Sequence, residues 1–125
     1  LASDAPSEIS EGVGWRETGQ HSMSIEDLPN PGLCEPDTFR ERVTYRPVDM
    51  NHIDNDLVDF DFCWSACCFE HLGSIRHGLD FVRNSLDCLV PGGIAVHTTE
   101  LNLSSNTETL ESEHLSLYRR SDIQT

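Results

Sequence analysis

Glu70 and His71 are neighbours in the sequence, and His97 follows in the same half of the chain. A histidine titrates near neutral pH, so either ring could take a proton from a reacting hydroxyl or amine. The carboxylate of Glu70 could orient a partner group. These residues are therefore our candidates for general acid–base chemistry. The alternative is that each histidine is a hydrogen-bonded structural residue.

Soft metal ligands occur in the same region, at Cys67, Cys68, His71 and His97. Zinc sites ordinarily contain pairs of cysteines separated by two residues, and the sequence has no such pair. No feature marks an activated thiolate either. We therefore predict neither a metal site nor a nucleophilic cysteine. The five cysteines are expected to be reduced thiols in a cytoplasmic protein.

The candidate residues lie in a stretch that reads as strand, loop, helix, tight turn and strand. Leu57–Trp64 is an apolar run of strand length, and Ser74–Leu89 has apolar residues close to helical spacing. Pro91-Gly92-Gly93 is expected to stop the helix and turn the chain before a strand that opens at Ile94–Val96. Such a βαβ unit joins parallel strands, and ligands of an open parallel sheet bind beyond the carboxyl ends of its strands.

The flanking segments predict smaller elements. We expect a strand stub at Leu1–Asp4, one helical turn at Ser24–Leu28 ended by Pro29–Gly32, a helix at Pro36–Arg42, an edge strand at Val43–Met50, a short helix at Thr109–Leu115, and a final strand or tail at Ser116–Arg120. The chain is expected to be one α/β domain over residues 1–125, with its core in residues 43–102. Its sheet would have about four mainly parallel strands with flanking helices.

The charge of the chain narrows the classes of partner. The formal net charge is −14, from 22 acidic residues and 8 arginines, and lysine is absent. Non-specific binding to nucleic acid or to an anionic membrane needs clustered basic residues, so this composition argues against both. The sequence has no apolar run of about 18 residues, the length that a membrane-spanning helix requires. No signal segment opens the chain.

The pattern from DFDFCWS through EHLGS to LVPGGIAVH resembles the fourth strand, following helix and fifth strand of a class I S-adenosylmethionine-dependent methyltransferase. In that family an acidic strand end precedes a loop of small residues that often carries Glu-His. A Leu-x-Pro-Gly-Gly turn follows before the next strand. The resemblance implies an incomplete Rossmann-like methyltransferase sheet and S-adenosylmethionine as cofactor.

The resemblance also implies roles for the strand ends. Asp4 would accept hydrogen bonds from the ribose hydroxyls of the cofactor, and Asp49 would accept one from the adenine amino group. Met50 would pack on the adenine ring. The small side chains of Ser65 and Ala66 would let the backbone approach the cofactor closely. One of the candidate histidines would take the proton of the methyl acceptor.

The first strand of the family and its Gly-x-Gly-x-Gly loop are missing, and the last two strands are not evident. The chain also starts at Leu1 rather than Met, which fits a fragment of a longer protein. Two interpretations follow. In one, the chain resembles a methyltransferase of unknown acceptor that is weak or inactive alone. In the other, it is a non-catalytic binding or assembly module. Because a sheet that lacks its central strand exposes edges, we expect a homodimer through those edges.

Overall fold

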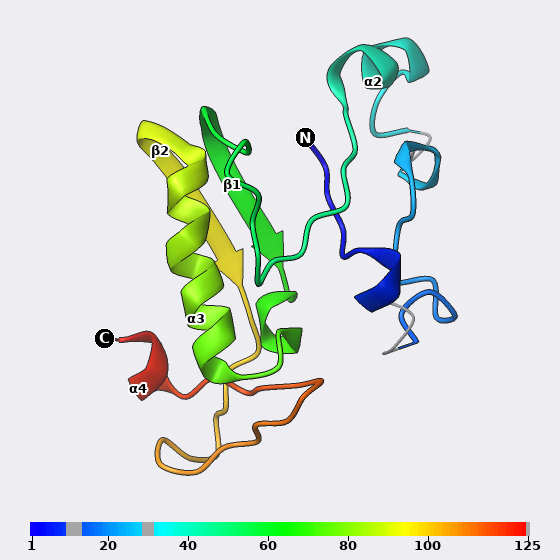
Figure 1. Cartoon of the computed structure of the whole chain (residues 1–125). Coiled ribbons are helices and arrows are strands. Elements are labelled where there is room, and N and C mark those ends of the chain that lie inside the picture. The colour runs from blue at the N-terminus through cyan, green and yellow to red at the C-terminus, as the bar shows by residue number, and fades with distance from the viewer. Residues whose placement is uncertain (10–13, 29–31, 125) are drawn as a thin grey trace. The chain divides into compact units, whose positions relative to one another are not determined.

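The computed structural model describes residues 1–9, 14–28 and 32–124 (Figure 1). The chain forms two compact units, Leu1–Asp49 and Met50–Thr125, and each is described by itself. The expected core, residues 43–102, therefore has residues in both units. Within the described ranges, no helix has both the length and the apolar character needed to cross a membrane.

The second unit is built on a strand–helix–strand connection, as the sequence predicts. Strand β1 (Phe60–Ala66) and strand β2 (Leu89–Thr98) pair in parallel, with helix α3 (Ile75–Asn84) between them in the chain (Figure 1). The register places Phe62 opposite Ile94 and Ala66 opposite Thr98. This two-stranded parallel sheet confirms the α/β class. The further strands of the expected sheet remain a prediction.

Helix α3 begins where the sequence indicates but ends earlier. The hydroxyl of Ser74 caps it by accepting a hydrogen bond from the His77 backbone N–H at 3.1 Å. The helix ends at Asn84 and continues as a 3₁₀ turn, η3 (Ser85–Cys88). The expected role of Pro91-Gly92-Gly93 was therefore wrong, because these residues lie inside β2 as an irregularity in its pairing with β1. Gly92 has φ 89°, a conformation that glycine adopts without steric cost.

The core of the second unit forms around one face of α3. Its buried residues are Phe69, Ile75, Phe81 and Tyr118. Phe69 opens a 3₁₀ turn, η2 (Phe69–His71), and its ring lies 4.9 Å from that of Tyr118. Gly78 is buried under these rings, and a β-carbon there would collide with the Tyr118 hydroxyl. The absence of a side chain at Gly78 thus allows the C-terminal segment to enter the core.

The C-terminal segment returns to the sheet rather than forming a tail. Leu101 and Tyr118 form a parallel bridge, and the Tyr118 N–H donates to the Glu100 carbonyl at 3.1 Å. The helix expected over Thr109–Leu115 is wrong, because Glu111 pairs antiparallel with Ser116 around a tight turn. A short helix, α4 (Arg120–Ile123), follows.

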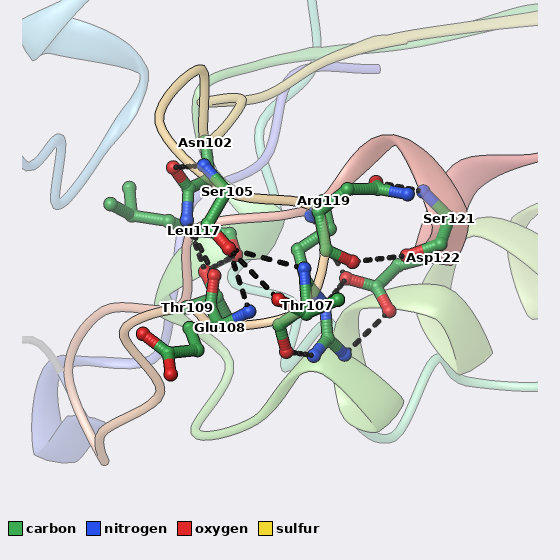
Figure 2. A network of polar contacts seen from close by, with 10 residues as sticks. Asn102, Ser105, Thr107, Glu108, Thr109, Leu117, Arg119, Ser121 and Asp122 are labelled. Carbon is green, nitrogen blue, oxygen red and sulfur yellow. Dashed lines mark hydrogen bonds and ion pairs between the residues drawn. The ribbon is translucent and has the colours of Figure 1, made fainter.

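Side chains organise the loop between β2 and α4 (Figure 2). The Asn102 carboxamide accepts from the Ser104 and Ser105 N–H groups and donates to the Glu108 carbonyl. The Arg119 guanidinium donates twice to Asp122, at 2.8 Å each, and once to the Thr107 carbonyl at 3.0 Å. Hydrogen bonds from side chains to the backbone therefore replace regular secondary structure in this loop.

The first unit contains η1 (Ile25–Asp27) and α2 (Pro36–Arg42), both where the sequence predicts helical turns. Of the expected stop at Pro29–Gly32, residues 29–31 lie outside the described residues. The two predicted strands are reduced to one parallel bridge, between Ala2 and Tyr45. The Val48 N–H continues this pairing by donating to the Asp4 carbonyl at 2.9 Å.

Candidate functional site

The carboxyl ends of β1 and β2, and the residues that follow them, are linked by hydrogen bonds. The Ser65 hydroxyl lies 2.9 Å from Nδ1 of His97. The Cys67 N–H donates to both the carbonyl and the hydroxyl of Thr98, at 3.0 and 3.2 Å. The Thr99 hydroxyl donates to Oε2 of Glu70 at 3.0 Å. These contacts bring three of the candidate residues, Ser65, Glu70 and His97, to one edge of the sheet.

The backbone turn after β1 starts at Cys67. This residue has φ 50°, in the left-handed region that non-glycine residues seldom adopt. Ala66 precedes it, is exposed, and pairs with Thr98 at the last position of the sheet. The turn therefore leaves the end of β1 accessible at Ala66, while it directs the following residues into the core at Phe69.

His97 lies between two serines and has a defined tautomer. The Ser85 hydroxyl donates its only hydrogen to the Val82 carbonyl at 2.9 Å, so its 3.0 Å contact with Nε2 of His97 requires the ring to donate there. The neutral ring then accepts at Nδ1 from the Ser65 hydroxyl. Burial lowers the pKa of His97 below its ordinary value, which favours this neutral form.

The aromatic core holds the His97 ring in place. The ring of Phe81 meets it edge-on with centroids 5.2 Å apart, and the ring of Phe69 does so at 6.4 Å. Both nitrogens of His97 have hydrogen-bond partners, so any proton that it takes from a ligand must pass through the hydroxyl of Ser65. His97 is thus placed to polarise Ser65 rather than to meet a substrate directly.

Glu70 and His71 are adjacent in sequence but face different partners. Glu70 is almost fully buried, and its Oε1 has no hydrogen-bond partner among the described residues. His71 donates from Nδ1 to the carbonyl of His114 at 2.7 Å, which joins it to the C-terminal segment. Each of the two residues thus has a hydrogen bond that ties it to another segment, Glu70 to Thr99 and His71 to His114.

The residues that the resemblance assigns to the cofactor are in both units. Asp4 and Asp49 belong to the first unit, where the Asp4 carboxylate accepts from the Ala5 and Ser22 N–H groups at 2.8 and 2.9 Å. Met50 belongs to the second unit and packs against its core cluster. Each carboxylate oxygen of Asp4 keeps a second lone pair, so this group still fits hydroxyl donors.

Sequence reasoning missed the polar groups around Asp4. His21 has a buried side chain, and its Nε2 donates to the Ala5 carbonyl at 2.7 Å and lies 4.0 Å from the Asp4 carboxylate. The Tyr45 hydroxyl donates to the Ser22 carbonyl at 2.6 Å. Burial, then the charges of Asp4 and Asp27, raise the pKa of Tyr45. No local pattern in the sequence marks His21 as buried, because its neighbours are polar.

A groove of about 450 Å³ is lined by residues of α3 and of the C-terminal segment, and none of the candidate residues lines it. Its charged lining alternates in sign, with Arg76 and Arg83 each 3.5 Å from Asp80 and with Arg119 bound to Asp122. Among the described residues, no three side chains of the metal-binding types gather at one point.

Comparisons of the chain with protein-family models, with curated proteins and with solved structures found no match.

Proposed function

We propose that the chain is part of an S-adenosylmethionine-dependent methyltransferase-like domain, with its site at the carboxyl edge of β1 and β2. The observation that supports this most is the parallel β1–α3–β2 unit, whose strand ends bring together Ser65, Glu70 and His97. Ligands of open parallel sheets bind at such an edge. The sequence pattern that resembles the family covers the same unit.

In this proposal the chain's own residues position the acceptor and move its proton. Methyl transfer is an in-line displacement, in which the acceptor's lone pair forms the new bond to carbon while the sulfonium–methyl bond breaks. The acceptor's proton would pass to the Ser65 hydroxyl as that hydroxyl gives its own to Nδ1 of His97. The small side chains of Ala66 and Ser65 would leave room for the cofactor at the strand end, as the resemblance implies.

Calorimetry with S-adenosylmethionine tests this function. Binding heat that Ala66→Leu reduces, and that Asp37→Asn on the exposed surface of α2 leaves unchanged, supports the proposal. The absence of heat at millimolar ligand would retire it for this chain. Asp37 is a suitable control because its side chain is fully exposed and its ion pair with Arg40 is exposed as well.

One observation favours the alternative, a non-catalytic binding or assembly module. Both ring nitrogens of His97 and one carboxylate oxygen of the buried Glu70 have partners within the unit, so these groups stabilise its fold. Pairing of a second copy along the outer edges of β1 or β2 would then give the expected homodimer. Light scattering that shows only monomer at tens of micromolar would contradict it. A cytoplasmic location belongs to the same proposal and rests on the five free cysteines.

A further inference from the structure

One face of the two-stranded sheet carries four large apolar side chains that solvent reaches. They are Phe62, Trp64, Ile94 and Val96, which are 53%, 68%, 59% and 48% exposed. The register pairs Phe62 with Ile94 and Trp64 with Val96, so the four form two adjacent cross-strand pairs. We call this surface the open face.

The opposite face of the same strands is the one that α3 covers. Residues in strands alternate between faces, so Cys63, Ser65 and His97 lie on the covered side. The contact between the His97 and Phe81 rings confirms that α3 packs there. Parallel sheets are found almost only with both faces covered, and contiguous exposed apolar patches mark interaction sites. The open face therefore has the character of a surface that a second layer covers.

The charges around the open face select the kind of partner. Asp59 is exposed just before β1, and Glu100 is exposed just after β2. No arginine or lysine occurs in residues 54–66 or 89–101. The four arginines of the second unit lie on α3 and around α4, at Arg76, Arg83, Arg119 and Arg120. A second copy of the chain would bring the same carboxylates against these ends, whereas a basic partner would neutralise them.

We propose that the open face binds a basic amphipathic helix of a partner protein. Its apolar residues, spaced three and four apart, would cover Phe62, Trp64, Ile94 and Val96, and its lysines or arginines would flank the acidic ends of the strands. This inference goes beyond the proposed methyltransferase-like function and does not depend on it. The open face and the Ser65–His97 pair lie on opposite sides of the sheet.

The full chain carrying Trp15→Phe tests the proposal, because Trp64 is then its only tryptophan. The probe is a synthetic helical peptide of leucine and lysine with one apolar face. Binding is expected to shift the Trp64 emission to shorter wavelength. Phe62→Ser is expected to weaken binding at least tenfold, and the isosteric Val96→Thr to weaken it in the same direction. Leu103→Ser, at a side chain that is 89% exposed in the loop after β2, is the matched control and should leave binding unchanged.

Because none of these substitutions changes charge, a purely electrostatic association would not respond to them. Unchanged binding in both Phe62→Ser and Val96→Thr would therefore overturn the proposal. Equally tight binding of a peptide that has glutamate in place of each lysine would also overturn the proposal. Two findings on the chain without peptide would also overturn the proposal. One is Trp64 emission that is already that of a buried indole. The other is a dimer, seen by sedimentation, that Trp64→Ser abolishes. A dimer that survives Trp64→Ser does not form through the open face, and together with peptide binding by the Trp15→Phe chain it supports the proposal.

Discussion

The hydroxyl of Tyr118 occupies the space that a side chain on Gly78 would need. It donates to the Phe69 carbonyl at 3.2 Å, and a β-carbon on Gly78 would stand 2.7 Å from that same carbonyl oxygen. A glycine inside a helix ordinarily costs stability relative to alanine. Here it lets α3 and the C-terminal segment approach closely.

Gly78→Ala should consequently destabilise the chain although alanine is the better helix former. Overpacking of this kind costs about 1–3 kcal/mol. The change is measured as the free energy of unfolding in urea. In the Tyr118→Phe background, which removes the colliding hydroxyl, the cost of Gly78→Ala should be smaller. An equal cost in both backgrounds would mean that the contact with Tyr118 is not its cause.

The buried carboxylate of Glu70 makes Thr99→Val a costly substitution. Thr99 donates to Oε2, and Oε1 has no partner among the described residues. Leaving a buried polar group unsatisfied costs about 1–3 kcal/mol, and more when the group is charged. The double variant Glu70→Leu/Thr99→Val removes both groups and should recover part of the loss. Thr98→Val, at the exposed last position of β2, should cost less.

His97 predicts how stability depends on pH. Burial lowers the pKa of His97 in the folded chain. Near this pKa the folded chain therefore binds fewer protons than the unfolded chain does. The contribution of His97 is fully present above the unfolded pKa of about 6.5 and is lost as pH falls through the lower folded value. The free energy of unfolding in urea should therefore fall between about pH 7 and pH 5. This fall should be smaller in His97→Gln and unchanged in His114→Gln. Nitrogen-15 NMR should show the hydrogen on Nε2.

The Arg119–Asp122 pair should control the order of the C-terminal loop. The hydrogen bonds from Arg119 lower the pKa of Asp122, so the carboxylate's contribution is present above its usual pKa and is lost as pH falls through the lowered value. Asp122→Asn should speed amide hydrogen exchange at Asn102, whose N–H donates to the Tyr118 carbonyl. Asp37→Asn removes an exposed pair with Arg40 and should leave that exchange rate unchanged.

The sequence predicts the strand–helix–strand unit because its signals are local. Apolar runs of strand length, a serine cap at Ser74 and helical spacing all act within a few residues of one another. The position of Tyr118 in the core is not local, because it depends on Gly78 and Phe69 far back in the chain. The segment that carries it therefore looked like a strand or a tail.

Side-chain competition with the backbone explains why the helix predicted over Thr109–Leu115 is wrong. The Ser112 hydroxyl accepts from the Leu115 N–H and donates to the Leu115 carbonyl, which satisfies a turn where a helix was expected. For the candidate site, the residue types at the strand ends marked Ser65 and His97 among the candidates, and the structure shows that these two are in contact. The residue types could not reveal Ser85, whose hydroxyl orients the ring of His97 from the end of α3.

The irregularity at Pro91-Gly92-Gly93 decides which residue meets Ser65. Between the pairs Phe60–Leu89 and Phe62–Ile94, β1 advances by two residues and β2 by five. With uninterrupted pairing from Leu89, the residue opposite Ser65 would be Ile94 instead of His97. The extra length is an odd number of residues, so it also reverses which side of β2 faces α3. Regular pairing over the present length would turn His97 toward solvent and Val96 toward α3, exchanging the polar and apolar surfaces of the strand.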